Sequence, residues 1–229
     1  MWVELFLSLV LAHLVADFVS QTDKSCKDKR ERHWKSPHLY VHALIVFGLS
    51  WLASCDAGFW WCALIIGVAH FGIDMWKSNR ADKIVWFTLD QIIHLLVVAG
   101  VAYSWTLCHD WSLPLGIELW HVAAAVALIV CWKPANIFIK LMLKHYSVNM
   151  PAEKENGFNA GALIGTIERW LILLFVCLGR YDALGLLIAA KSIIRFSEKD
   201  NAKTEYVLAG TLLSIFIAVL AGMMVIGVK

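Results

Sequence analysis

Long apolar segments alternate with short polar segments along the whole chain, and most charged residues lie between the apolar segments. An α-helix needs about 20 apolar residues to cross a bilayer core of about 30 Å. A backbone in lipid must also satisfy its own hydrogen bonds, so repeated segments of this kind predict helices. We therefore predict an all-α polytopic helix bundle with eight membrane spans, at residues 2–22, 38–54, 59–77, 84–105, 118–139, 161–178, 183–196 and 204–227.

The composition agrees with a membrane protein. Of the 229 residues, 60% are hydrophobic and 17% are charged, and the mean hydropathy is +0.67. These values exclude a disordered chain and an ordinary soluble domain. Several tryptophans lie at the ends of apolar segments, where amphipathic rings favour the headgroup region. They are Trp2, Trp60, Trp61, Trp105 and Trp120.

The distribution of basic residues predicts the orientation. Residues 23–37, DKSCKDKRERHWKSP, hold six Lys and Arg side chains, and every second connection after them is also basic. The remaining connections and ends hold only Arg180 and Lys229. Because short Lys/Arg-rich loops stay in the cytoplasm, we predict both termini outside. The first span lacks a basic leader and a small-residue cleavage site, so we expect it to remain in the mature protein.

The six cysteines predict no metal site of their own. They show no CxxC spacing and no regular framework, which argues against a thiolate zinc site or a disulfide scaffold. We expect most of them to pack as small apolar residues. Cys55, Cys62 and Cys108 fall near the predicted outer face, so one disulfide among these three stays open.

Three predicted spans each carry a His and an Asp four positions apart, in HLVAD, HFGID and DQIIH. This spacing places both side chains on one helix face. The order is reversed in DQIIH, and that span also runs in the opposite direction, so all three Asp side chains are expected nearer the cytoplasm than their His. His42 in the second span falls at the same depth, within roughly 5 Å. The predicted layer comprises His13, Asp17, His42, His70, Asp74, Asp90 and His94.

The free-energy cost of placing these carboxylates in the membrane must be offset by other interactions. An Asp in the middle of a bilayer costs about 2.5 to 3.5 kcal/mol, and three together cost roughly 8 to 10 kcal/mol. Neutral imidazoles and carboxylates are ligands of zinc, manganese and iron, which favours a divalent-metal site. Two alternatives stay open: hydrogen bonds between Asp and His that only tie the helices together, or a proton or ion pathway. The division between metal ligands and supporting groups is also open. For the other histidines we expect solvated or interfacial positions; they are His33, His38, His109, His121 and His145.

A second set of charges lies in the C-terminal spans. Arg169 is too deep in its span to reach the headgroups, so we expect a salt bridge with Glu168 or with an Asp of the layer. Lys191 and Arg195, four positions apart, either snorkel to the headgroups or bind a ligand. A basic cluster near a metal suits an anionic substrate such as a phosphate ester, which Arg typically clamps with two hydrogen bonds. The predicted substrate-binding residues are therefore Arg169, Lys191 and Arg195.

The motifs HLVADFVSQTDK, HFGIDMWKS, DQIIH, GALIGTIERWLILL, AAKSIIRF and EYVLAGTLLS resemble an uncharacterised bacterial multi-span membrane family of unknown function. The resemblance covers nearly the whole chain, and DQIIH and AAKSIIRF carry it most clearly. It implies a multi-pass protein of the bacterial inner (plasma) membrane. The pattern of intramembrane His and Asp is also similar in style to inner-membrane metal-dependent hydrolases, an analogy of pattern that carries no assigned chemistry.

We therefore expect a single transmembrane domain over residues 1–229, with His/Asp-bearing spans in 1–105 and Arg/Lys-bearing spans in 161–227. The leading function is a metal-dependent hydrolase of a phosphoester or similar anionic lipid or small molecule at the cytoplasmic side, with Asp17, Asp74 and Asp90 catalytic. The alternatives are a metal-ion or proton transporter and a scaffold that binds a soluble partner. Few polar residues lie outward of the layer, which favours chemistry over transport. The expected partners are the lipid bilayer and an anionic substrate, and no nucleic acid.

Overall fold

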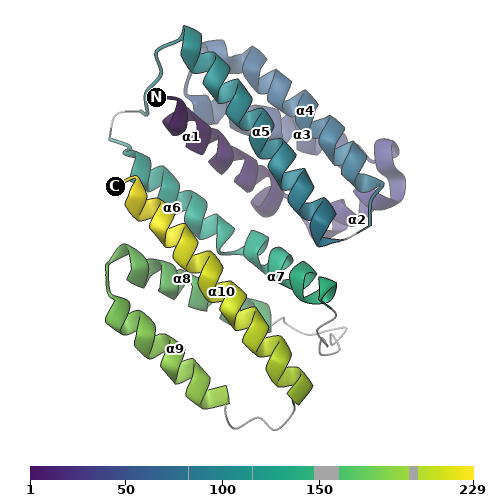
Figure 1. Cartoon of the computed structure of the whole chain (residues 1–229). Helices are drawn as coiled ribbons and strands as arrows, with labels where there is room; N and C mark the ends of the chain where they lie inside the picture. The colour runs from purple at the N-terminus through teal and green to yellow at the C-terminus, as the bar shows by residue number, and fades with distance from the viewer. Residues whose placement is uncertain (82, 115, 147–159, 196–200) are drawn as a thin grey trace. The chain divides into compact units, whose positions relative to one another are not determined.

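The computed structural model describes residues 1–81, 83–114, 116–146, 160–195 and 201–229, and only the backbone at 160, 194, 195 and 201–204. Every regular element within these ranges is helical (Figure 1). The elements are α1 (Trp2–Leu14), the π-helix η1 (Val15–Ser20), α2 (Asp23–Arg32), η2 (His33–Lys35), α3 (Pro37–Ser54), η3 (Ala57–Phe59), α4 (Trp60–Ser78), α5 (Ile84–Cys108), α6 (Leu119–Val130), α7 (Lys133–His145), α8 (Ala160–Cys177), α9 (Tyr181–Arg195) and α10 (Asn201–Gly227). The predicted all-α class is confirmed.

Five segments of the described chain are long and apolar enough to cross a membrane. They are Trp2–Ser20, Pro37–Ser54, Ala57–Ser78, Ile84–Cys108 and Glu205–Gly227, and the bent pair of α6 and α7 makes a sixth if it is one span. The helix α9 has 15 residues and is short for a span. A membrane protein is therefore supported, whereas eight spans and the sides on which the termini lie stay predictions.

The fifth predicted span, residues 118–139, is not one straight helix. Helix α6 ends at Val130, α7 begins at Lys133, and the two are bent by 42°. Pro134 lies at the start of α7, where a missing N–H and a fixed φ are tolerated but a continuous helix is not. The break leaves carbonyl groups at the end of α6 that need partners from other helices.

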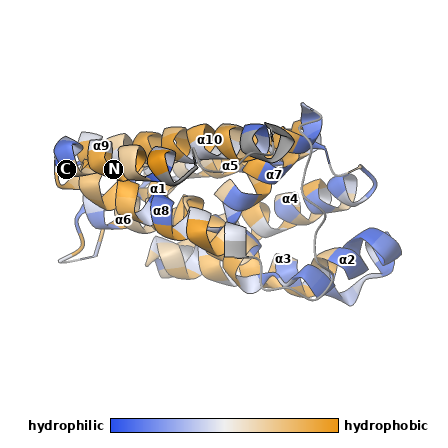
Figure 2. Ribbon diagram, turned by 90° about the horizontal axis from the view of Figure 1, so that it is seen from below, coloured by the Kyte–Doolittle hydropathy of each residue, from blue (hydrophilic) through white to orange (hydrophobic). Residues whose placement is uncertain are grey.

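The basic connection at residues 23–37 is largely helical. A reciprocal capping box starts α2, in which Ser25 N–H donates to Thr22 Oγ1 at 3.3 Å and Thr22 N–H donates to Ser25 Oγ at 3.1 Å. Figure 2 shows α2 as hydrophilic along its length, beside the largely hydrophobic α3. None of its ten residues is buried, so α2 depends on a few polar contacts, including the 2.5 Å hydrogen bond from Ser36 to Asp28.

The described chain divides into two compact units, residues 1–126 and 127–229. In the first unit α1 packs against α3 and α5, and α4 packs against the same two helices (Figure 1). Leu5, Leu9 and Ala16 of α1 and η1 are fully buried. A side chain at Gly67 of α4 would come within 3.3 Å of the Ala43 carbonyl oxygen, so glycine permits close contact with α3. The four helices therefore share one interior.

The second unit is built around α8 and α10. A Cβ atom at Gly222 of α10 would meet the Val176 side chain of α8 at 2.6 Å, so this pair packs closely because Gly222 has no side chain. Helix α7 contacts both α8 and α10, and α9 contacts α8. The single transmembrane domain that the sequence predicts stays a prediction.

Candidate metal centre

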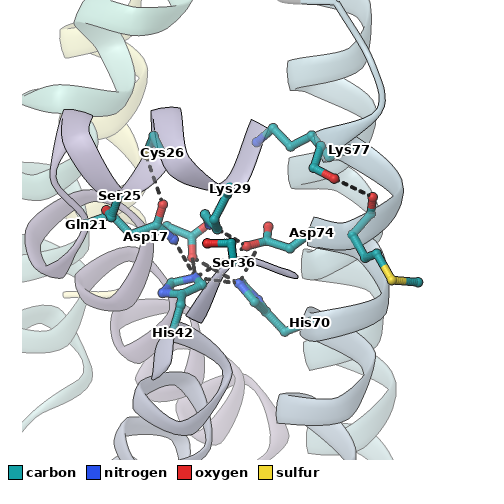
Figure 3. Close-up of polar contacts among 12 residues, drawn as sticks. Asp17, Gln21, Ser25, Cys26, Lys29, Ser36, His42, His70, Asp74 and Lys77 are labelled. Carbon is teal, nitrogen blue, oxygen red and sulfur yellow. Dashed lines mark hydrogen bonds and ion pairs between the residues drawn. The ribbon is translucent and has the colours of Figure 1, made fainter. Parts of the chain in front are cut away.

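The first unit brings together all seven His and Asp side chains of the predicted layer. They come from α1 and η1, α3, α4 and α5, and Figure 3 shows how Asp17, His42, His70 and Asp74 converge. The four histidine rings form one group, with neighbouring ring centroids 4.1 to 5.4 Å apart. Spacing of four in the sequence therefore predicted the cluster correctly. The roles of these residues as ligands or catalytic groups stay predictions.

Asp17 lies at the centre of one half of this cluster. It belongs to the π-helix η1, and such wide turns are frequent at functional sites. Its Oδ1 lies 3.2 Å from His42 Nε2 and 3.3 Å from His70 Nε2, and the two nitrogens lie 2.8 Å apart. Ligand atoms held about 2.1 Å from one tetrahedral ion are about 3.4 Å apart. The two distances from Asp17 Oδ1 are close to this value, and the distance between the two nitrogens is shorter.

Three overlapping groups of side chains have ligand atoms within 4.8 Å of one another. The groups are His13 with Asp17 and His70, His42 with His70 and Asp74, and Asp74 with Asp90 and His94. Asp74 belongs to two of them, and a carboxylate has two oxygens with which it can bridge a pair of ions. The arrangement therefore suits either one ion or a two-ion centre with Asp74 between the ions.

His94 shows the hydrogen-bonding pattern of a metal ligand. Its Nδ1 lies 2.8 Å from the backbone oxygen of Asp90, which can only accept, so Nδ1 carries the proton. The lone pair is then on Nε2, which is buried and has no hydrogen-bond partner among the described residues. A second hydrogen bond that fixes the tautomer in this way is typical of ligating histidines.

Unpaired polar atoms are concentrated in this cluster. Of the five buried side-chain N and O atoms without a hydrogen bond in the described part of the chain, four belong to it. They are Asp17 Oδ1, His42 Nδ1, Asp90 Oδ1 and His94 Nε2. A buried atom left unpaired costs about 1 to 3 kcal/mol, and native proteins rarely leave several together. The cluster therefore contains more hydrogen-bond acceptor atoms than N–H groups that could donate to them.

Two lysines that the sequence analysis did not include among the candidate site residues contact this cluster. Lys29 Nζ of α2 lies 2.6 Å from Asp74 Oδ2, and Lys77 of α4 forms an ion pair with Asp90 Oδ2 (Figure 3 shows the lysines). Lys77 follows Asp74 by three positions, so helical spacing could have placed it on the same face. Lys29 comes from the connection between two spans, and no local pattern predicts its partner.

Two glutamines and a cysteine support the cluster. The Gln21 amide lies 2.5 Å from His42 Nε2, and Gln91 Oε1 lies 3.4 Å from His13 Nε2. Cys26 donates a hydrogen bond from Sγ to Gln21 Oε1 at 3.2 Å. Burial raises the pKa of the Cys26 thiol, so this group stays protonated and acts as a donor rather than as a thiolate ligand.

The salt bridge predicted for Arg169 is wrong. Its side chain is 1% exposed, and among the described residues only neutral groups accept its hydrogen bonds. The acceptors are Cys131 O at 2.6 Å, Asn136 Oδ1 at 2.6 Å, Thr166 Oγ1 at 3.1 Å and Ser214 Oγ at 3.2 Å. Cys131 follows the last residue of α6, so Arg169 satisfies a carbonyl that the helix break leaves free. Arg169 supports the break between α6 and α7.

The neighbouring charges in the second unit form their own pair. Glu168 of α8 forms an ion pair with Lys191 of α9. Successive residues of an α-helix point about 100° apart, which explains why Glu168 and Arg169 have different partners. The side chain of Arg195 lies outside the described residues. All three predicted substrate-binding residues belong to the second unit, whereas the His and Asp residues belong to the first.

The remaining predictions agree with the described chain for His but only in part for Cys, because Cys62 and Cys131 are buried whereas the other four cysteines are half-buried or exposed. All six cysteines are free, so the disulfide left open among Cys55, Cys62 and Cys108 does not form. The histidines outside the cluster are half-buried or exposed, as expected for solvated or interfacial positions. They are His33, His38, His109, His121 and His145.

The fold and the site define a class: an all-α protein with several helices apolar enough to cross a membrane and a buried His/Asp cluster. Residues 5–123 match the family described as a protein of unknown function, DUF3307, and the chain belongs to that family. The match includes every His and Asp of the cluster and ends before α7, so AAKSIIRF and the other C-terminal motifs lie outside it. No curated protein and no solved structure matches the chain.

Proposed function

We propose that the chain is a multi-pass protein of the bacterial inner membrane, with eight spans and both termini outside, and that it is a metal-dependent hydrolase. The site is the His/Asp cluster of the first unit, and the substrate is a phosphoester or similar anionic group of a lipid or small molecule on the cytoplasmic side. The observation that carries the proposal is His94, whose tautomer leaves a buried Nε2 lone pair free to bind a metal.

The ligand types suit zinc, manganese or iron. Imidazole nitrogens and carboxylate oxygens are present without a thiolate, and these metals accept that mixture. A bound ion of this kind would polarise the scissile group and activate a water molecule. His42, His70 and Asp74 would hold one such ion, and Asp74, Asp90 and His94 would hold a second.

The third carboxylate, Asp17, would manage protons. Its Oδ1 lies 3.2 Å from His42 Nε2 and 3.3 Å from His70 Nε2, so Asp17 is placed beside these ligands to take a proton from an attacking water. His13 Nε2 lies 3.4 Å from Gln91 Oε1, which can only accept, so this nitrogen carries a proton; it also lies 3.9 Å from Asp17 Oδ2, where its N–H would stabilise the Asp17 carboxylate. Burial among apolar helices strengthens these electrostatic effects, because little solvent competes with them.

The opposite end of the first unit favours chemistry over transport. Phe59 and Trp105 are buried there and pack edge to face, with ring centroids 5.2 Å apart. The Ser8 and Ser54 hydroxyls donate to backbone carbonyls of their own helices. These two hydroxyls are therefore already paired within their helices, and two aromatic rings fill that end of the unit.

Activity in nanodiscs tests the proposal. The protein would be stripped with a chelator, reloaded with Zn²⁺, Mn²⁺ or Fe²⁺, and assayed on soluble phosphomonoesters and on phosphatidic acid. We expect metal-restored hydrolysis that falls about 100-fold or more in Asp17→Asn. Asp56→Asn should keep it, since Asp56 only caps η3. Metal or proton flux in proteoliposomes without hydrolysis would instead identify a transporter.

A further inference from the structure

Two candidate metal ligands, Asp74 and Asp90, already form ion pairs with lysine side chains. Lys29 Nζ contacts Asp74 Oδ2 at 2.6 Å, and Lys77 contacts Asp90 Oδ2. Both carboxylates belong to the group that also contains His94. Lys29 is largely buried, with 12% of its side chain exposed, so this contact is not a loose surface pair.

A metal ion and an ammonium group compete for these oxygens. Two cations that share one carboxylate oxygen repel each other strongly where the local dielectric is low. A divalent ion that binds Asp74 and Asp90 through Oδ1 or Oδ2 lies close to both ammonium groups, and this repulsion favours displacement of Lys29 and Lys77. Helix α2 can follow such a change, because no residue of α2 is buried and few contacts hold it.

Charge balance then determines what the lysines bind next. With neutral imidazoles, the three carboxylates of the described cluster exceed the two ammonium groups by one negative charge. A single divalent ion makes the cluster positive, and a second ion makes it strongly so. Buried net charge is costly unless a counter-ion joins it. A phosphoryl group offers two negative charges and several acceptor oxygens, which matches two released ammonium groups.

We propose that Lys29 and Lys77 are the anion-binding residues of this centre. In the metal-free protein they neutralise Asp74 and Asp90, and in the metal-loaded protein they bind the phosphoryl group of the substrate or product. This inference rests on the proposed function, and it gives the lysines the role predicted for Arg169, Lys191 and Arg195. It also makes metal and phosphate binding mutually reinforcing.

Calorimetric titration of the full-length protein with inorganic phosphate, with and without bound metal, tests the inference. Phosphate should bind the metal-loaded protein at least ten times more tightly than the metal-free protein. Lys29→Gln and Lys77→Gln should lose that gain while binding the metal as tightly as the wild type or more tightly, because a competing cation is gone. Lys27→Gln is the matched control on α2, since Lys27 is exposed and Glu31 is its ion-pair partner among the described residues.

Three results would overturn the inference, and they separate it from the proposed function. Metal binding with equal phosphate affinity in the wild type and both lysine variants removes the inference and leaves the hydrolase proposal intact. Weaker metal binding in well-folded Lys29→Gln shows that the lysine supports the ligands instead of competing with the metal. No metal binding in the wild type overturns both proposals. Lys29→Arg, which keeps the charge, should retain phosphate binding if the fold is intact.

A separate arm of the same experiment identifies the source of the phosphoryl group. Metal affinity would be measured in nanodiscs of phosphatidylcholine, with added phosphatidic acid or with added inorganic phosphate. A higher metal affinity with phosphatidic acid alone indicates that the site binds a lipid headgroup. A higher metal affinity with inorganic phosphate alone indicates that it binds a small anion. No rise with either ligand overturns the inference.

Discussion

The two units bury charged side chains in opposite ways. In the second unit Arg169 is buried, and four neutral acceptors take its hydrogen bonds. In the first unit most of the carboxylates and imidazoles are also buried, but atoms such as Asp90 Oδ1 and His94 Nε2 have no hydrogen-bond partner among the described residues. A buried charged side chain whose hydrogen bonds are accepted by other groups of the protein stabilises the fold. A buried polar cluster left incomplete is a candidate binding site.

The chemistry of the side chains explains the difference. Arginine presents five N–H donors in a fixed plane, which suits a broken helix that offers a carbonyl and nearby polar side chains. Carboxylates only accept, and a neutral imidazole both donates and accepts once, so a cluster of these groups has too few protons. Cations must supply the balance in the first unit, and Lys29 and Lys77 supply part of it.

The largest predicted effect is on the stability of the second unit. Arg169→Lys keeps the charge but cannot reach four acceptors, so we expect a loss of about 3 kcal/mol or more. Thermal melts in detergent would measure it. Lys191→Gln is the control, because its partly exposed ion pair should contribute about 1 kcal/mol or less. An Arg169→Lys protein that melts like the wild type would contradict the structural role.

The next effect concerns the metal. Asp74→Asn and Asp90→Asn should each weaken metal binding by about tenfold or more, because the amide has nearly the same shape but is a poorer ligand. Asp17→Asn should weaken it as well, because the Asp17 carboxylate lies 3.2 Å from His42 Nε2 and its negative charge favours a bound cation. Competition with a chelating dye would measure the affinities. Arg169→Lys protein that remains folded should bind metal normally. If the three Asn variants retained wild-type affinity, the cluster would be a hydrogen-bonded structural tie or a proton relay.

A double-mutant cycle should separate the neighbouring charges of α8. Glu168→Gln and Lys191→Gln should show a coupling of about 0.5 to 1 kcal/mol in thermal stability, because their side chains are in contact. Glu168→Gln and Arg169→Gln should couple more weakly, since no hydrogen bond or ion pair joins these two side chains in the described part of the chain. Strong coupling of Glu168 with Arg169 would restore the salt bridge that the structure rejects.

The smallest effect is a labelling rate on α2. Because burial raises the pKa of the Cys26 thiol, less thiolate is present at neutral pH, and maleimide should react with Cys26 a few times more slowly than with the exposed Cys55. The Cys26 rate should rise with pH as the thiol ionises. Single-cysteine variants in intact cells would also test sidedness, since labelling of Cys26 from outside would reverse the predicted orientation.

The sequence predicted those features that repeat along one helix. Spacing of four between His and Asp located the cluster, and long apolar segments located the helices. The Lys29 contact was not predictable, because it depends on where the polar helix α2 lies against α4. The partners of Arg169 were not predictable either, since a backbone carbonyl and neutral side chains leave no pattern of charge. Pro134 was a visible signal for the broken helix, but it does not indicate which residue satisfies the break.

The central claim is that the His/Asp cluster of the first unit binds a divalent metal ion. Elemental mass spectrometry of protein purified without a polyhistidine tag tests it directly, on the wild type, His94→Gln and His109→Gln. Both histidines lie along or just after α5, but His109 is exposed and stacks on Trp105. We predict stoichiometric zinc, manganese or iron in the wild type and His109→Gln, and a clear loss in His94→Gln. Equal metal content in all three proteins, or none in the wild type after loading, would contradict the claim.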